Sequence, residues 1–206
     1  FLFSFFAWVR GIRIETIHIF FNDINFTLNP LFSLIITSTW LVGIVNAINW
    51  IDGCDGLAIG VNIIIYVNLI IYSFIKGNYD FIFFLLSILG ASLSFYKFNK
   101  YPAKIIMGDS GSYFLGSSLA IFSLTLFKNP IPSEGNLIGF NIIIPLILMS
   151  VPLADMFLVI LSRLVSNKSP FFPDKSHLHH KLMSIGLSQK TTVAYIYCLV
   201  LITNLI

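Results

Sequence analysis

Charged residues are scarce in this sequence. Only 10% of the 206 residues are Asp, Glu, Lys or Arg, whereas 57% are hydrophobic, and the mean hydropathy is +0.90. Because an ordinary soluble domain carries about 25% charged residues, the composition excludes that class and predicts an integral membrane protein. The net charge of +3 is small and scattered along the chain, so it gives no indication of a nucleic-acid partner.

Cysteine is scarce as well. The two cysteines, Cys54 and Cys198, lie far apart in the sequence, which excludes a disulfide framework and a cysteine-based metal site. The sequence also lacks an initiator methionine and opens and closes inside apolar runs. We therefore expect the chain to be a fragment of a longer polytopic protein.

Long apolar runs dominate what is present. Lipid offers no partners for open backbone groups, so these runs predict membrane-spanning helices. By contrast, the stretch "GIRIETIHIFFNDINFTL", residues 11–28, partly alternates apolar and polar residues and predicts an extracytoplasmic β-hairpin. The predicted fold is an all-α polytopic membrane protein, one multi-span helical bundle over residues 1–206, with spans near 1–9, 31–48, 58–75, 81–96, 111–127, 138–162 and 191–206.

The basic residues indicate which loops face the cytoplasm. Counting crossings sorts the loops into 49–57, 97–110 and 163–190 on one side and 10–30, 76–80 and 128–137 on the other. The first set carries eight of the Lys and Arg residues and the second carries four. By the positive-inside rule the first set is cytoplasmic. Most of the unusual polar residues lie in the same set, which predicts a composite site on that surface.

The stretch "NAINWIDGCDGLAIG", residues 46–60, places acids and amides between two apolar runs. A charge in hydrocarbon costs at least about 2.5 kcal/mol, so these side chains must line a polar cavity or a membrane surface. Carboxylate and amide oxygens suit a hard cation such as Mg²⁺, which commonly bridges to substrate phosphates. The candidate residues here are Asn46, Asn49, Asp52, Asp55 and Gly56.

A second polar motif, "MGDSGSYFLG", begins at Met107 and opens a predicted span. Asp109 could be a metal ligand, and the N–H groups of a helix N-terminus can receive an anion. The alternative is that Asp109 or Ser110 only caps the helix.

The third motif, "PFFPDKSHLHH", gathers His177, His179 and His180 beside two lysines. Imidazole and ammonium groups can neutralise a diphosphate or act as acid and base near neutral pH. One alternative is a basic loop that binds anionic lipid. A zinc site is a weaker alternative, because no fourth ligand lies at a standard spacing.

Asp155, in "VPLAD", is an acid within the predicted span 138–162. An ionisable residue at that depth is a functional candidate by default. A buried polar pairing between helices is the other interpretation, and Pro145 and Pro152 could kink this span.

Together the three motifs resemble those of the polyprenyl-phosphate N-acetylhexosamine-1-phosphate transferase superfamily, glycosyltransferase family 4. The resemblance is carried by "NAINWIDGCDGLAIG", "FNKYPAKIIMGDSGSYFLG" and "PLADMFLVILSRLVSNKSPFFPDKSHLHHKL", in family order and over most of the chain. The "HLHH" form is similar to the bacterial branch that uses GlcNAc-1-phosphate.

The resemblance implies a Mg²⁺-dependent enzyme, with Mn²⁺ as an alternative ion, in the bacterial plasma (inner) membrane with its active site on the cytoplasmic face. The implied reaction joins UDP-N-acetylhexosamine and undecaprenyl phosphate into a lipid-diphosphate-sugar and releases UMP, the first membrane step of a cell-surface polysaccharide. The implied metal ligands are Asn49 and Asp109. The other implied site residues are Asp52 and Asp55 near metal and nucleotide, the three histidines at the diphosphate, and Asn46, Asn99, Gly56 and Arg163 at the substrate. A homodimer is left open.

Three departures from the family pattern bear on whether the chain can catalyse the implied reaction. The family's paired upstream aspartates have no counterpart, so the chain as given is expected not to turn over. Ile106 replaces a usual aromatic residue, and Cys54 replaces a usual aliphatic one. A catalytically dead or truncated relative is therefore one alternative function. A membrane transporter is another, although its polar residues should be spread through the spans.

Overall fold

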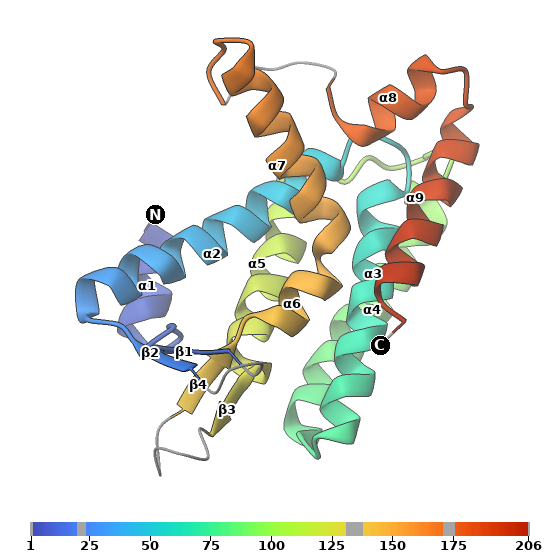
Figure 1. The fold of residues 1–206 in the computed structure, drawn as a ribbon. Coiled ribbons are helices and arrows are strands. Elements are labelled where there is room, and N and C mark those ends of the chain that lie inside the picture. The colour runs from blue at the N-terminus through green and yellow to red at the C-terminus, as the bar shows by residue number, and fades with distance from the viewer. Residues whose placement is uncertain (1, 20–23, 131–137, 171–175, 206) are drawn as a thin grey trace.

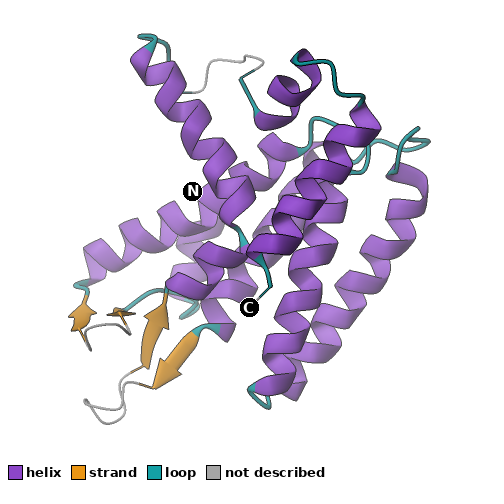
Figure 2. Cartoon of the chain, turned by 45° about the vertical axis from the view of Figure 1, so that its right-hand side comes forward, coloured by secondary structure: helices purple, strands orange, loops and turns teal. Residues whose placement is uncertain are grey.

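The structure, a computed structural model, describes residues 2–19, 24–130, 138–170 and 176–205. Helices dominate these residues, and four short strands lie together at one end (Figures 1 and 2). In chain order the elements are α1 (Leu2–Val9), β1 (Thr16–Ile19), β2 (Ile24–Thr27), α2 (Pro30–Ile51), α3 (Leu57–Ile75), α4 (Tyr79–Asn99), α5 (Gly108–Leu126), β3 (Lys128–Pro130), β4 (Ile138–Asn141), α6 (Ile143–Leu148), α7 (Ser150–Val165), α8 (Leu178–Ser184) and α9 (Gln189–Thr203).

The long apolar helices confirm the predicted membrane fold. Within the described residues, α2, α3 and α4 are long and apolar enough to cross a bilayer. The predicted span 111–127 is also helical, as α5, but its serines make it less apolar. The fold is thus an all-α polytopic bundle with a small sheet.

Helices α2 and α5 pack closely, and a glycine allows it. A Cβ at Gly116 would lie 2.8 Å from the Cα of Val45, so a larger residue there would push the helices apart. From this contact, the C-terminal part of α2 and the N-terminal part of α5 extend towards the same end of the bundle (Figure 1). The contact therefore brings the last turn of α2 against the first turn of α5.

The sheet includes the predicted hairpin and extends beyond it. Strands β1 and β2 pair antiparallel, with Thr16 opposite Thr27. The sheet order is β2-β1-β4-β3, and β1 pairs with β4 in parallel. The prediction was correct about the hairpin but omitted the two later strands.

The predicted span 138–162 is wrong as a single helix. Residues 138–141 form β4, and the helix that follows is interrupted at Met149 between α6 and α7. Pro145 and Pro152 flank the interruption, and proline cannot donate the backbone hydrogen bond that a continuous helix needs. The apolar strand residues had no distinguishing hydropathy, so they were counted with the helix.

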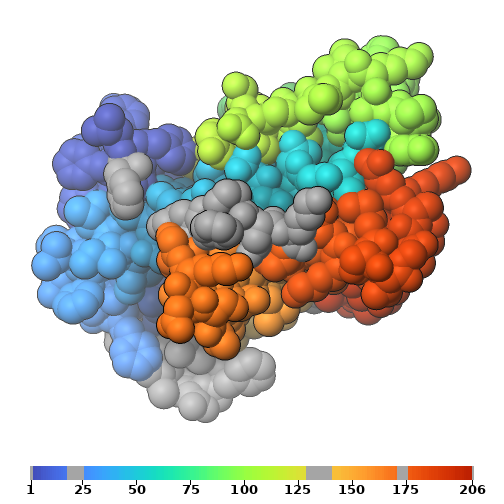
Figure 3. Space-filling model, turned by 90° about the horizontal axis from the view of Figure 1, so that it is seen from above, coloured from blue at the N-terminus to red at the C-terminus, as the bar shows by residue number. Residues whose placement is uncertain are grey.

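The polar motifs and the sheet lie at opposite ends of the bundle. The end of α2, the beginning of α3, the end of α4 and the beginning of α5 meet near α8, at the top of Figure 1. Figure 3 looks down on that end and shows the C-terminal segment in red beside the cyan and green helices. The loops that the charge count grouped together are therefore also grouped in space.

Candidate active site

The centre of the site is a contact between α2 and α5. The Nδ2 of Asn49 donates to Oδ1 of Asp109 at 3.1 Å and to the Oγ of Ser112 at 2.9 Å. Asn49 lies one turn beyond Val45, and Ser112 one turn before Gly116, so the close helix contact sets up these bonds. Residues 60 positions apart in sequence are thus joined, as the composite-site prediction requires.

Asp109 does not cap α5, which removes the capping alternative. Met107 occupies the N-cap position, and no side chain makes a cap hydrogen bond there. Asp109 lies exposed in the first turn, where the positive end of the helix dipole favours a carboxylate. The carboxylate is therefore available to a ligand.

Asp52, at the end of α2, lies near Asp109, at the beginning of α5. Burial and then the neighbouring Asp109 charge raise the pKa of the Asp52 carboxyl from 3.8 to about 6. Two acids that disfavour each other's charge are a feature of cation sites and of catalytic sites. The arrangement attracts positive charge to the ends of α2 and α5.

The loop after α2, residues 52–56, is held by groups at the end of α4 and in the loop that follows it. Oδ2 of Asp55 accepts from the Ala103 N–H at 3.0 Å. Asn99 is buried, accepts from the Gly56 N–H at 3.2 Å and donates to the Ile105 carbonyl at 2.9 Å. Asn99 thus shapes the site in this structure, and its predicted contact to substrate stays a prediction.

Asp155, on α7, anchors the histidine motif. Its Oδ2 lies 2.8 Å from Nδ1 of His177, and its Oδ1 accepts from the Leu178 N–H at 2.7 Å. Asp155 and His177 are both buried. Asp155 therefore connects α7 with the residues at the start of α8. This pairing helps to position the histidine motif at the site.

His179 lies under the acidic loop. A Cβ at Gly53 would come within 2.1 Å of the His179 Nε2, so only glycine admits this ring. The ring is 2% exposed, and neither of its nitrogens has a hydrogen-bond partner within the residues that the structure describes. Burial, and then His180 and His177, lower the pKa of His179 to about 4, so the ring is neutral. His180 is half-buried, with its ring centroid 4.3 Å from that of His179.

Arg163 supports the same region from α7. Its guanidinium lies 5.0 Å from the Trp50 ring centroid, and its Nη1 donates to the Pro170 carbonyl. The Trp50 ring in turn meets His177 edge-on at 5.7 Å between centroids. Arg163 is 4% exposed, and in this structure it connects α7 with α2 and with Pro170, the first residue of the motif "PFFPDKSHLHH".

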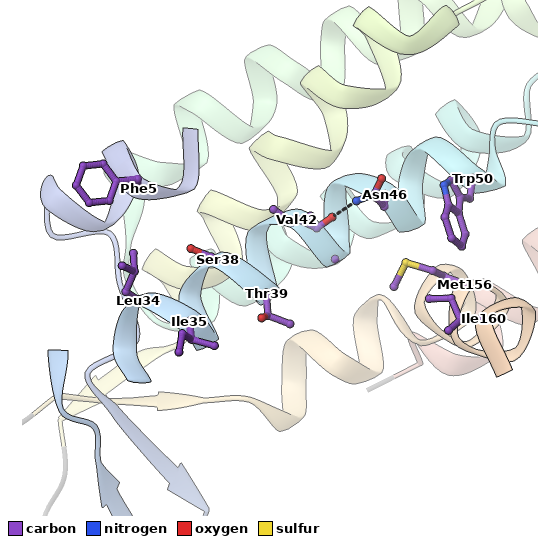
Figure 4. Close-up of a pocket in the computed structure, with 11 residues that line it drawn as sticks. Phe5, Leu34, Ile35, Ser38, Thr39, Val42, Asn46, Trp50, Met156 and Ile160 are labelled. Carbon is purple, nitrogen blue, oxygen red and sulfur yellow. Dashed lines mark hydrogen bonds between the residues drawn. The ribbon is translucent and has the colours of Figure 1, made fainter. Parts of the chain in front are cut away.

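An apolar groove of about 590 Å³ runs along α2 away from the site (Figure 4). Phe5 and Leu34 lie at one end, and Trp50 lies at the other, opposite Met156 of α7. Asn46 lines the groove while its Nδ2 donates to the Val42 carbonyl at 2.8 Å. A groove with apolar walls that ends beside charged groups suits an amphiphile.

Comparisons with known proteins show the family of this chain. The model of Glycosyl transferase family 4 matches residues 1–127. The chain belongs to glycosyl transferase family 4. A "Probable undecaprenyl-phosphate N-acetylglucosaminyl 1-phosphate transferase" of Bacillus subtilis is 40% identical over 163 residues, which cover 79% of this chain and 44% of that protein.

Two further relatives are of related kinds. The decaprenyl-phosphate N-acetylglucosaminephosphotransferase of Mycobacterium leprae is 38% identical over 80% of this chain and 45% of that protein. A phospho-N-acetylmuramoyl-pentapeptide-transferase of Listeria monocytogenes is 42% identical over 55% of this chain and 35% of that protein. The chain thus spans less than half the length of these curated relatives.

The donor set of this family 4 chain fits a magnesium ion better than zinc. The described residues contain no group of three His, Cys, Asp or Glu side chains placed to hold a metal. Two acids, Asp52 and Asp109, with the amide of Asn49 supply few oxygen ligands, and Mg²⁺ completes such a set with waters and substrate phosphates. Burial, and then the Asp109 charge, raise the pKa of Asp52, and a bound cation would offset the second of these effects.

Sequence reasoning missed two contributors to this family 4 site. Trp50 lies inside the motif "NAINWIDGCDGLAIG", and an aromatic residue between charged segments was the signal that could have identified it as a site residue. Tyr197, whose hydroxyl donates to the Gly56 carbonyl, lies in an apolar run 141 residues away and gave no signal. The structure otherwise brings the three motifs to one end of the bundle.

Proposed function

We propose that this chain carries the catalytic surface of a glycosyl-1-phosphate transferase. The enzyme would move N-acetylhexosamine-1-phosphate, with GlcNAc as the favoured sugar, from a UDP-sugar to undecaprenyl phosphate and release UMP. The observation that carries the proposal is the Asn49–Asp109 contact beside Asp52, because it assembles an oxygen-rich anionic site from two separate motifs. The names of the relatives support the same kind of transfer.

The residues divide naturally between the two substrates. Phosphoryl transfer requires positioning and charge neutralisation more than covalent chemistry from the protein. Asp109 and Asn49, with Asp52 nearby, would hold Mg²⁺, which when bound would neutralise the diphosphate of the donor. His180 is half-buried at the surface of the histidine segment, residues 176–180. It is the histidine best placed to contact that diphosphate.

The remaining histidines contribute by shape. His177 is fixed by Asp155, and the neutral His179 supports the acidic loop from below, so both set the position of His180. The groove beside Trp50 would receive the polyprenyl chain, with its phosphate at the acidic end. The lysines of the loops 97–110 and 163–190 support a cytoplasmic orientation for this end under the positive-inside rule, so the proposed site would face the cytoplasm.

The test is a transfer assay in detergent on the complete protein of which this chain is expected to be a part. UMP release should require UDP-GlcNAc, undecaprenyl phosphate and Mg²⁺ together, and chelation by EDTA should abolish it. A matched reaction with UDP-glucose should be slow if the acetamido group is recognised. Release of UMP that does not depend on the lipid acceptor would contradict the proposed transfer.

A further inference from the structure

We propose that Tyr197 is a positioning residue that fixes the acidic loop, residues 52–56, through the backbone of Gly56. The catalytic consequence of this role rests on the proposed transferase function, whereas its effect on the loop does not. Tyr197 lies on α9, which contributes none of the three motifs.

The first support is the pair of side chains that hold Gly56. The Tyr197 hydroxyl donates to the Gly56 carbonyl, and the Gly56 N–H donates to Oδ1 of Asn99 at 3.2 Å. Both peptide groups of one residue are therefore held by side chains from two different helices. The carbonyl also accepts the first helical bond of α3, from the Gly60 N–H at 2.9 Å, so the hydroxyl is an additional donor.

The second support is that two glycines make room for the arrangement. A Cβ at Gly60 would lie 2.0 Å from the Tyr197 Oη, so the end of the phenol ring rests on the α3 backbone. Gly56 has a φ of +78°, a left-handed conformation that glycine adopts without strain. A Cβ at Gly56 would also lie 3.2 Å from the Lys100 Cα. The loop is enclosed on both sides.

The third support is what the anchored residue positions. Asp55 directly precedes Gly56 and is itself held by the Ala103 N–H, and Asp52 begins the same tight loop. A shift at Gly56 therefore moves carboxylates that must face the ends of α2 and α5. Misplacement of catalytic groups by about 1 Å can cost on the order of 100-fold in rate.

Cys54 offers a readout of loop position that needs no catalysis. It lies between the two acids and is 7% exposed, so a thiol reagent reaches it only when the loop opens.

The experiment compares Tyr197→Phe with Tyr195→Phe. Tyr195 lies on the same helix and is 49% exposed, so it is a matched control. Membranes are treated with N-ethylmaleimide, and the modified fraction of the Cys54 peptide is followed by mass spectrometry. Tyr197→Phe should raise the modification rate about three- to tenfold, the effect of one lost hydrogen bond, while Tyr195→Phe should leave it unchanged.

A second variant protects the test against a folding defect. Gly60→Ala keeps the hydroxyl but displaces the ring, so it should expose Cys54 in the same way. Transfer assays on the same samples should show kcat lowered about tenfold or more for Tyr197→Phe, with KM for undecaprenyl phosphate unchanged. Unchanged Cys54 modification in both Tyr197→Phe and Gly60→Ala overturns the inference. A raised Cys54 modification rate in a complete protein whose wild type releases no UMP upholds loop positioning and refutes the transferase function instead.

Discussion

The two ends of the bundle satisfy their polar groups in different ways. At the sheet end, partners are matched: Arg13 pairs with Glu15 at 2.5 Å, and the Ile14 N–H donates to Oγ1 of Thr37 at 3.0 Å. At the site end, two carboxylates repel each other and a buried histidine has no partner among the described residues. These pairs at the sheet end are internally satisfied, whereas the site end keeps charge that a ligand would neutralise.

The largest difference between the ends should appear in activity. Asp109→Asn removes a negative charge from the proposed metal site and little volume, so kcat/KM for transfer should fall at least about 100-fold. Glu15→Gln at the sheet end also removes one exposed charge and should change kcat/KM less than about twofold. UMP release in detergent measures both, after membrane insertion is checked for each. Near wild-type transfer by Asp109→Asn would remove Asp109 from the site.

A smaller effect is expected from two buried hydrogen-bond acceptors, one at each end. Asp155→Ala releases His177 and the Leu178 N–H, so kcat/KM should fall about tenfold or more because the histidine segment loosens. Thr37→Val leaves the Ile14 N–H without its partner and should lower the unfolding free energy by about 1–3 kcal/mol with kcat/KM nearly unchanged. Thermal unfolding and UMP release on the same samples separate the two outcomes. An Asp155→Ala variant that loses stability but keeps its kcat/KM would make Asp155 a purely structural residue.

The smallest predicted effect reverses the usual sign of a mutation. The folded-state pKa of Asp52 is raised to about 6 from 3.8, so its stabilising contribution is complete below pH 3.8 and is lost as the pH rises through 6. In EDTA at pH 7.5, Asp52→Asn should therefore raise Tm by about 2–4 °C, a value reduced to allow for the half-exposed side chain. At pH 4 the difference should vanish. A Tm that falls at pH 7.5 in EDTA would show that the folded state does not disfavour the charged form of Asp52.

Sequence patterns predicted the parts of the molecule that depend on local chemistry. Helices α2, α3 and α4 follow from hydropathy, and the β1–β2 hairpin follows from its alternation of apolar and polar residues. Strand β4 was missed because Ile138 and Phe140 are as apolar as helical neighbours, and pairing with β1 and β3 selects the strand.

The site shows the same limit. The three motifs could be assigned to one face from charge and order, but not the position of each side chain. The burial of His179 depends on the shape of Gly53, and the pairing of Asp155 with His177 depends on how α7 packs. Contacts between distant segments decide these details, and a single sequence does not contain them.

The parallel pairing of β1 with β4 has a consequence for biosynthesis. Ile17 of β1 is paired with Phe140 of β4, so β1 cannot form this pair until the four long helices α2, α3, α4 and α5 have been synthesised. At about 5–20 residues per second, that delay is roughly 6–25 s. During this interval β1 and β2 expose an unpaired edge, and the helical core inserts before the sheet can close. Completion of the sheet is therefore a late step in maturation, and chaperones that bind extended segments would have their opportunity there.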